Sequence, residues 1–542
     1  MKPTDATTIG QLIAVAADTF GEKAAIEDGD VTISYRDLHV RGLQAARAFI
    51  ASGLEHGDRV GIWAPNLFEW VIAAIGLQMV GGVLVPLNTR MKGAETAYIL
   101  EKSGARMLFT MDEFLGARYI DLLLDAMGRG DGRPVAGLPD LERIVSFRST
   151  DSREKTGIGT WDAFLALGQS VSDAEARARA DRVEGEDLSD ILFTSGTTGK
   201  PKGVMTEHAQ NLRGFEVWTD VVGLRADDRY LIVNPFFHSF GYKAGWLSCF
   251  LRGATCLPQD VFDVPKVLDR IGRDHVSALP GPPTLYQTIL AHPEFESYDL
   301  SSLRLAVTGA AVVPVDLIIK MREVLAFETV ITGYGLTETC GIVTMCRHDD
   351  DPETIANTSG RAIPGVDVQC VDPEGNEVAR GEPGEVVVRG YNVMRGYFDD
   401  EAATTETIDS DGWLHTGDIG VMNERRYLRI TDRIKDMFIM GGFNCYPAEI
   451  ESMLCSHDAV AQVAVIGVPD ERMGEVGMAF VVPMPGATLD EKAIIAWCRE
   501  NMANYKVPRH VSILDELPMN AMGKVTKFVL RERAGELLER SQ

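Results

Sequence analysis

The most informative stretch of this 542-residue sequence is Thr194-Ser195-Gly196-Thr197-Thr198-Gly199-Lys200-Pro201-Lys202-Gly203. It directly follows Asp190-Ile191-Leu192-Phe193, a largely apolar run that predicts a strand. The glycines leave the backbone free to curl, so that its N–H groups can converge on an anion. The hydroxyls add hydrogen-bond donors and the lysines add positive charge. The stretch therefore indicates a loop that holds a polyphosphate ligand.

Two other interpretations of this segment are a Walker A loop and a flexible surface turn. A Walker A loop requires Gly-x-x-x-x-Gly-Lys-[Ser/Thr]. Here Pro201 follows Gly199-Lys200, and Thr194 stands where the first glycine would be, so the Walker A pattern is excluded. A flexible surface turn is disfavoured because a strand, glycines, hydroxyls and lysines coincide.

Strand and helix patterns alternate through the chain before this loop. Strands are predicted at residues 24–27, 31–33, 59–63 and 83–87, and helices at residues 35–53 and 68–80. After the loop, residues 278–283 and 305–311 repeat a strand followed by small residues. This alternation predicts an α/β fold with a largely covered sheet.

The pattern changes after residue 360. Short strands separated by turns at residues 372–375 and 381–384 predict a small β subdomain that ends near residue 430. After Asp432-Arg433-Ile434-Lys435-Asp436 a compact α+β unit begins. We therefore expect a large N-terminal domain of α/β sheets with the β subdomain, residues 1–434, and a small α+β C-terminal domain, residues 435–542.

Composition and charge exclude several classes of protein. With 45% hydrophobic and 24% charged residues, the chain has the composition of a folded globular protein. Its net charge of −26 would repel a nucleic acid or an anionic membrane surface. Eight cysteines without a Cys-x-x-Cys pair indicate reduced thiols and a cytoplasmic protein. The apolar residues 70–87 are interrupted by Gln78 and Gly81-Gly82, which favours a buried helix and strand over a membrane span.

Other segments combine small residues with polar groups. In Ile331-Thr332-Gly333-Tyr334-Gly335-Leu336-Thr337-Glu338-Thr339, the tyrosine offers a flat face for a base, while Thr337 and Glu338 offer oxygens for phosphate and a hard cation. A packed turn with a solvated Glu338 is the alternative. Gly309-Ala310-Ala311 also fits plain strand–helix packing. Asp418 in Thr416-Gly417-Asp418 can accept two ribose hydroxyls or cap its own turn. Without the other segments, Lys524 would be interpreted as an ordinary solvated surface lysine.

Together these segments resemble the adenylate-forming superfamily of acyl-CoA synthetases, peptide-synthetase adenylation domains and insect luciferases. The resemblance covers essentially the whole chain and favours the acyl-CoA synthetase branch. Its segments occur in the family's order: residues 194–203, Phe237-His238, Tyr334-Gly335-Leu336-Thr337-Glu338, Thr416-Gly417-Asp418, Asp432-Arg433-Ile434-Lys435-Asp436, Gly441-Gly442-Phe443-Asn444 and residues 520–524.

The resemblance implies a ligase with two half-reactions. A carboxylate attacks the α-phosphate of ATP to give acyl-AMP and pyrophosphate, and a thiol then attacks the acyl carbonyl and expels AMP. Because the first step joins two anions, charge neutralisation is its main requirement. The resemblance assigns the β- and γ-phosphates to residues 194–203 and Mg²⁺ to Glu338. The remaining ATP site comprises Gly309, Ala310, Ala311, Tyr334, Gly335, Thr337, Asp418 and Arg433, with Asp418 at the ribose.

The resemblance also implies that the C-terminal domain swings about Lys435. Adenylation then requires Lys524, which bridges the carboxylate and the α-phosphate. Thioester formation requires Gly441 and Gly442 instead, whose missing side chains leave room for a pantetheine arm.

The acceptor thiol is expected to be free CoA, because only about 18 residues follow Lys524 and no carrier-protein domain is expected. A stand-alone enzyme that loads a carrier protein, a luciferase-type oxidation, a phosphoryl-transfer ATPase and a non-catalytic homologue are the alternatives. Zinc hydrolysis has no support, since the sequence has no His-Glu-x-x-His motif or close Cys/His cluster. The sequence does not determine the oligomeric state, and a homodimer is one of the alternatives.

The acid substrate depends on the acyl pocket, which the resemblance assigns to Phe237, Tyr242, Lys243 and Trp246. His238 resembles the family's gating histidine, with a hydrogen-bonded core histidine as the alternative. Lys243 is expected to point to solvent, or else to meet a ketone or second carboxylate of the substrate. The region is similar to ligases of bacterial steroid breakdown that activate a bicyclic propanoate; a medium- or long-chain acid is the alternative.

Overall fold

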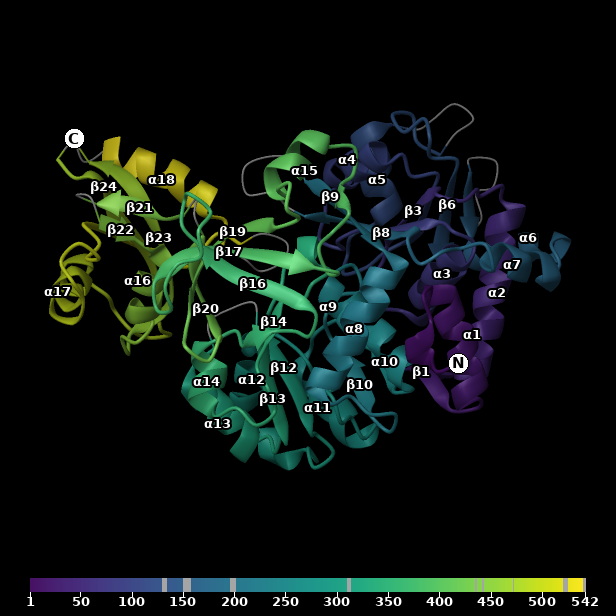
Figure 1. Cartoon of the computed structure of the whole chain (residues 1–542), viewed down its shortest axis with the longest axis horizontal. Coiled ribbons are helices and arrows are strands. Elements are labelled where there is room, and N and C mark those ends of the chain that lie inside the picture. The colour runs from purple at the N-terminus through teal and green to yellow at the C-terminus, as the bar shows by residue number, and fades with distance from the viewer. Residues whose placement is uncertain are drawn as a thin grey trace. The chain divides into compact units, whose positions relative to one another are not determined.

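The computed structural model describes residues 1–128, 134–149, 157–194, 201–309, 313–433, 436–440, 443–470, 472–519 and 525–539. The chain forms two compact units: residues 1–367 with 388–414, and residues 368–387 with 415–542. Figure 1 labels the elements along the chain. The domain boundary expected after residue 434 falls at residues 434–435, outside the described residues, and therefore stays a prediction.

The first unit contains an eight-stranded sheet in the order β18-β9-β8-β4-β3-β5-β6-β7. Its strands are β3 (Arg59–Trp63), β4 (Val83–Pro86), β5 (Met107–Met111), β6 (Arg143–Phe147), β7 (Ile158–Thr160), β8 (Leu188–Thr194), β9 (Lys202–Glu207) and β18 (Gly396–Tyr397). Strands β3 to β8 run parallel, and β9 returns antiparallel to β8. The glycine-rich loop therefore leaves the carboxyl end of β8, the edge at which α/β sheets bind ligands.

A second, mixed sheet of the first unit consists of two four-stranded parts, β10-β11-β1-β2 and β12-β13-β14-β15. Its strands are β1 (Ala24–Asp28), β2 (Val31–Ser34), β10 (Arg229–Ile232), β11 (Thr255–Pro258), β12 (Leu305–Gly309), β13 (Thr329–Tyr334), β14 (Thr344–Met345) and β15 (Arg361–Ala362). Ala278 joins the two parts through parallel bridges to Tyr230 and Leu305. Beyond this bridge the segment still follows β12, because the Leu279 and Gly281 N–H groups donate to the Leu305 and Val307 carbonyls, both at 2.9 Å. A helix then begins at Pro283, so residues 278–283 fit the predicted strand followed by small residues.

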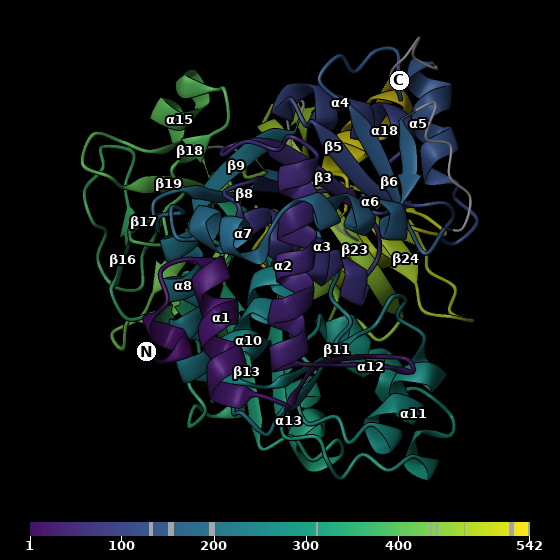
Figure 2. The same cartoon turned by 90° about the vertical axis from the view of Figure 1, so that its right-hand side faces the viewer.

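Helices α1 (Ile9–Phe20), α2 (Tyr35–Ala51) and α3 (Phe68–Met79) pack against one another, with α1 and α2 side by side in Figure 2. Gly76 permits the close approach of α3 to α2, since a Cβ there would lie 2.5 Å from Cβ of Ala45. Helix α3 is buried from Glu69 to Met79, which confirms the predicted core helix. Among the residues that the structure describes, none of the helices has the length and apolar character needed to cross a bilayer.

The remaining helices of the first unit connect strands of its two sheets, except for the last one, α15, which follows β18 and leads out of these sheets. They are α4 (Gly93–Ser103), α5 (Tyr119–Met127), α6 (Trp161–Leu167), α7 (Asp173–Ala180), α8 (His208–Val222), α9 (Ser239–Gly241), α10 (Ser248–Arg252), α11 (Val264–Arg273), α12 (Pro283–Leu290), α13 (Val315–Glu323), α14 (Pro352–Asn357) and α15 (Glu401–Thr407).

The predicted β subdomain is a four-stranded sheet in the order β16-β17-β19-β20. Its strands are β16 (Val366–Val371), β17 (Pro383–Gly390), β19 (Leu414–Met422) and β20 (Leu428–Arg433). The turn residues between β16 and β17 include Gly375 and Gly381, whose positive φ of 85° and 90° explains the preference for glycine there.

The C-terminal part of the second unit is an α+β fold, as expected from the sequence. Its sheet has the order β22-β21-β24-β23, with β25 beside β24. The elements are β21 (Phe438–Met440), β22 (Phe443–Cys445), α16 (Pro447–Leu454), β23 (Val460–Asp470), β24 (Gly474–Pro483), α17 (Glu491–Asn501), β25 (His510–Ile513) and α18 (Lys527–Glu539). Its core includes Phe438, Ile466, Phe480 and Leu530, all at most 2% exposed.

His208 is a buried contact between the first helix of the chain and the helix that follows β9. Its Nδ1 accepts a hydrogen bond from the Ile9 N–H at 3.3 Å, and the side chain is 0% exposed. Burial lowers the pKa of His208 to about 4, against smaller opposing effects of Asp190 and Asp187. The folded state therefore holds this imidazole neutral.

We expect acid to destabilise the wild type more than the variant His208→Asn. Because the pKa of His208 is lowered on folding, the unfolded chain binds the proton first, and stability is lost as pH falls below about 6.5. Between pH 7.5 and pH 5 the wild type should lose about 2 kcal/mol more than the variant, whose amide oxygen can still accept the Ile9 bond. Denaturant unfolding at both pH values measures the difference. The exposed His348→Asn is the control; equal losses in wild type and His208→Asn would contradict the prediction.

Candidate active site

The glycine-rich loop connects two strands that are paired to their ends. Thr194, the last residue of β8, pairs with Lys202, the first residue of β9. The Tyr98 hydroxyl donates a hydrogen bond to the Pro201 carbonyl at 3.3 Å, so the end of the loop is anchored to α4. The paired strands fix both ends of the loop, which is the arrangement that a phosphate-binding turn requires.

The segment around Tyr334 begins where a parallel strand of the second sheet ends. Gly309 at the end of β12 is in register with Gly333 near the end of β13. A Cβ on Gly335 would lie 2.3 Å from the Gly341 carbonyl oxygen, so only glycine fits this tight turn. Tyr334, Thr337 and Glu338 are half-buried at this carboxyl edge, which is where open α/β sheets bind nucleotides.

Glu338 is held by a residue that the sequence analysis missed. The Tyr397 hydroxyl donates a hydrogen bond to Glu338 Oε1 at 3.0 Å, and the Met394 N–H donates to the Glu338 carbonyl at 2.9 Å. Burial and the charge of Glu338 raise the pKa of Tyr397 well above its usual range, so the hydroxyl keeps its proton.

Tyr397 also meets the end of the glycine-rich loop. The Lys202 ammonium lies 4.8 Å from the centre of the Tyr397 ring, a cation–π contact. This contact exists because β18, which carries Tyr397, pairs with β9, which carries Lys202. One tyrosine thus links the predicted metal ligand to the predicted phosphate loop. The only sequence signal was a Gly-Tyr-Phe run, and its pairing with β9 is non-local.

His238 stands at the start of the short helix α9. Its Nδ1 accepts a hydrogen bond from the Phe240 N–H at 3.1 Å, so a neutral ring carries its proton on Nε2. The ring is half-buried, unlike a core histidine. Two asparagines that the sequence analysis missed hold the preceding turn. Asn66 accepts from the Phe236 N–H at 2.7 Å, and Asn234 donates to the Pro280 carbonyl at 2.9 Å.

The expectation that Lys243 points to solvent is wrong. Its side chain is 0% exposed, and its ammonium lies 3.0 Å from Oδ1 of Asp190, which is also 0% exposed. The turn is π-helical from Tyr242 to Leu247, which directs Lys243 inward toward β8. The pattern of aromatic residues around Lys243 could not reveal this partner, because Asp190 lies 53 residues earlier in the chain.

The other residues expected around the acyl group differ in their exposure. Tyr242 and Trp246 are 0% exposed and stack with ring centres 4.7 Å apart, whereas Phe237 is half-buried. The Tyr242 hydroxyl accepts a hydrogen bond from Gln78 at 2.8 Å. Burial raises the pKa of Tyr242 well above its ordinary value, so this hydroxyl is protonated. Their role in an acyl pocket stays a prediction.

In the second unit, Asp418 and Arg433 form one charged pair. They are in register on the antiparallel strands β19 and β20, and Arg433 Nε lies 2.9 Å from Asp418 Oδ1. The Asp418 side chain is only 5% exposed, whereas that of Arg433 is 40% exposed. Gly417, with φ of 68°, precedes Asp418 and donates its N–H to Glu385 at 3.1 Å. The carboxylate is thus fixed by its turn and its partner.

The neighbouring Asp432 belongs to the structure of the second unit. Its Oδ2 accepts a hydrogen bond from the Ala448 N–H at 2.8 Å, at the start of α16. Burial raises the pKa of Asp432 to about 6, although backbone donors oppose the shift. The remaining predicted site residues lie outside the described residues: Ser195, Gly196, Thr197, Thr198, Gly199, Lys200, Ala310, Ala311, Lys435, Gly441, Gly442 and Lys524.

Each unit, taken by itself, has groups that suit part of a phosphorylated ligand. The first unit offers a loop end with Lys202, a carboxylate held by a tyrosine, and backbone at the carboxyl edge of a parallel sheet. Glu338 and Thr337 supply oxygens of the kind that Mg²⁺ prefers beside phosphate oxygens. Asp418 of the second unit supplies a fixed acceptor of the kind that binds sugar hydroxyls.

Two curated ligases are similar to nearly the whole chain. The 3-[(3aS,4S,7aS)-7a-methyl-1,5-dioxo-octahydro-1H-inden-4-yl]propanoyl:CoA ligase of Rhodococcus jostii (strain RHA1) is 49% identical over 97% of this chain and 98% of that protein. The ligase of the same name from Mycobacterium tuberculosis is 50% identical over 90% of this chain and 91% of that protein.

A solved structure and two family models agree with these relatives. The crystal structure of the anthranilate CoA ligase AuaEII in complex with anthranoyl-AMP has a TM-score of 0.86 at 29% identity, and the match covers 99% of this chain and 100% of that one. The model of the AMP-binding enzyme family matches residues 13–398, and that of the AMP-binding enzyme C-terminal domain matches residues 449–524. The resemblance inferred from the sequence motifs is confirmed: this chain belongs to the AMP-binding enzyme family.

Proposed function

We propose that this chain is an ATP-dependent carboxylate–CoA ligase. The carboxylate oxygen attacks the α-phosphorus of ATP and pyrophosphate leaves; the CoA thiol then attacks the acyl carbonyl, loses its proton, and AMP leaves. The observation that carries the proposal is the similarity over 97% of the chain to a propanoyl:CoA ligase. The likeness to a ligase structure that contains an acyl-adenylate supports the same order of steps.

The first step brings two anions together, and the first unit supplies groups that can neutralise the phosphates. Residues 194–202 hold the β- and γ-phosphates of ATP through backbone N–H groups, hydroxyls and lysines. Glu338 is the protein ligand of Mg²⁺, which neutralises the pyrophosphate leaving group when bound. Tyr397 keeps the Glu338 carboxylate oriented through its 3.0 Å hydrogen bond. Gly309, Gly335 and Tyr334 form the backbone and the aromatic face beside the adenine.

The second unit contributes the groups that the family resemblance assigned to it. Asp418 accepts the ribose hydroxyls, and Arg433, with its Nε 2.9 Å from Asp418 Oδ1, keeps that carboxylate oriented. Lys524 bridges the substrate carboxylate and the α-phosphate, where a cation offsets the repulsion of two anions. Lys435 is the pivot of a domain rotation, and Gly441 and Gly442 line the path of pantetheine afterwards.

We propose a bicyclic, ring-bearing propanoate as the acid and free CoA as the acceptor. The two curated relatives at 49% and 50% identity carry the name of such a ligase. His238 lies beside the carboxylate end of this acid, on the turn that its Nδ1 holds through the Phe240 N–H. The proposed compartment is the cytoplasm, in keeping with cysteines that form no disulfide among the described residues.

The variant Lys524→Ala should separate the two half-reactions. Adenylate formation should fall by about 100-fold or more, because the cation that bridges two anions is lost. Conversion of supplied acyl-AMP and CoA to thioester should stay within about threefold of wild type, since that step does not use Lys524. Pyrophosphate release and thioester formation are measured separately. Lys492→Ala, an exposed lysine on α17, is the control; an equal loss in both steps would contradict the two-position mechanism.

A competition assay tests the substrate. With ATP, Mg²⁺ and CoA, the bicyclic dioxo-indanyl propanoate should have a kcat/KM at least about tenfold above those of octanoate and of palmitate, because a shaped apolar pocket discriminates by ring contacts. Mass spectrometry of the acyl-CoA products from mixed acids measures the ratio. A preference for either linear acid would contradict the proposed bicyclic substrate, but it would not contradict the proposed ligase activity.

A further inference from the structure

Three elements meet at the buried ion pair of Lys243 and Asp190. Lys243 belongs to the π-helical turn Tyr242–Leu247, Asp190 to β8, and Thr206 to β9. The Lys243 ammonium donates a hydrogen bond to Thr206 Oγ1 at 2.9 Å, and this hydroxyl donates to Asp190 Oδ1 at 2.7 Å. Strands β8 and β9 flank the glycine-rich loop. The pair therefore joins the turn of Lys243 to both strands that carry the loop.

The second oxygen of Asp190 is equally well occupied. Ser189 Oγ donates to Oδ2 at 2.6 Å and Asn211 Nδ2 donates at 2.7 Å, with the Tyr242 hydroxyl at 3.4 Å. A buried carboxylate that accepts bonds from several donors is held in one orientation, and its directional bonds define the position of each partner. Apolar side chains of the same volume would fill this space without fixing the register.

The turn of Lys243 is connected to His238 and to the Glu338 segment. The Tyr242 N–H donates to the His238 carbonyl at 2.9 Å, and this bond connects His238 to the turn. Ser239 packs against Gly341, where a Cβ would lie 2.9 Å from Ser239 Oγ. Burial raises the pKa of Cys340, next to Gly341, to about 12, and the nearby charge of Lys243 opposes this rise. Three parts of the proposed site thus converge on one ion pair.

We propose that Lys243 and Asp190 are positioning residues for adenylate formation. Their ion pair holds residues 237–247, and with them His238, in register with the strands that carry the phosphate loop. The inference rests on the proposed function and adds to it how the acid and ATP are aligned. Alignment governs the first half-reaction, because there a carboxylate oxygen must meet the α-phosphorus, and a misplacement of about 1 Å costs about 100-fold in rate.

The test replaces both charges at once, so that neither is left unpaired in the interior. In the double variant Asp190→Asn with Lys243→Met, kcat for adenylate formation should fall by at least about tenfold while the KM values for ATP and the acid stay within about threefold. Thioester formation from supplied acyl-AMP and CoA should stay within about twofold. The variant Thr206→Val, which keeps both charges and loses the bridging hydroxyl, should show a smaller loss in the same step.

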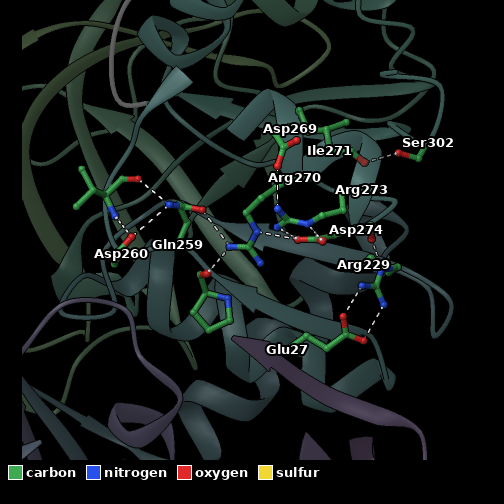
Figure 3. Close-up of polar contacts among 12 residues, drawn as sticks. Glu27, Arg229, Gln259, Asp260, Asp269, Arg270, Ile271, Arg273, Asp274 and Ser302 are labelled. Atoms are coloured by element: carbon green, nitrogen blue, oxygen red, sulfur yellow. Dashed lines mark hydrogen bonds and ion pairs between the residues drawn. The ribbon is translucent and has the colours of Figure 1, made fainter. Parts of the chain in front are cut away.

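The matched control is a partly buried ion pair at the C-terminal end of α11, between Arg270 and the capping residue Asp274. Figure 3 shows Arg270 between Asp274 and Gln259; its Nε lies 2.8 Å from Asp274 Oδ2. The double variant Arg270→Met with Asp274→Asn should keep both half-reactions at wild-type rates. The proposal is overturned if the Asp190/Lys243 variant keeps the wild-type kcat for adenylate formation, or loses both half-reactions by the same factor. If the wild-type protein itself forms no acyl-adenylate, the proposed function is overturned. This result is obtained before any variant is compared, so the two failures can be distinguished.

Discussion

The constraint on which this protein depends is the repulsion between two anions that must react. A carboxylate has to approach the α-phosphate of ATP inside a chain whose net charge is −26. Positive charge and N–H donors must therefore be concentrated locally. We propose that the chain does this with the lysines and glycines of residues 194–203, between two paired strands, and with Tyr397, which fixes the carboxylate proposed for Mg²⁺. The acidic remainder disfavours other polyanions as ligands.

Local patterns in the sequence predicted most of the fold. The strands expected at residues 24–27 and 31–33 and the buried helix expected at residues 68–80 follow from local apolar patterns. The strand followed by small residues that was expected at residues 278–283 is an extended segment that bonds to β12 as far as Gly281. Motifs in the order of a known family also gave the reaction class, which the family match supports.

The side-chain partners that sequence patterns did not predict come from segments that are far apart in the chain. Tyr397 reaches Lys202 because β18 pairs with β9, and Asn66 reaches Phe236 across 170 residues. The partner of Lys243 also comes from a distant segment. A lysine among aromatic residues suggests solvent or a substrate, and only the packing of a π-helical turn against β8 reveals Asp190 as its partner. Side chains with a non-local partner are therefore the ones that sequence patterns misassign.

The most direct test of the account identifies which phosphorus of ATP is attacked. The wild-type protein is incubated with ATP, Mg²⁺ and the bicyclic propanoate, first without CoA and then with it, and the nucleotides and phosphates are separated. The account predicts pyrophosphate and a bound acyl-AMP without CoA, and AMP with an equal amount of acyl-CoA once CoA is added. Release of ADP and orthophosphate, with no acyl-adenylate at any time, would contradict it.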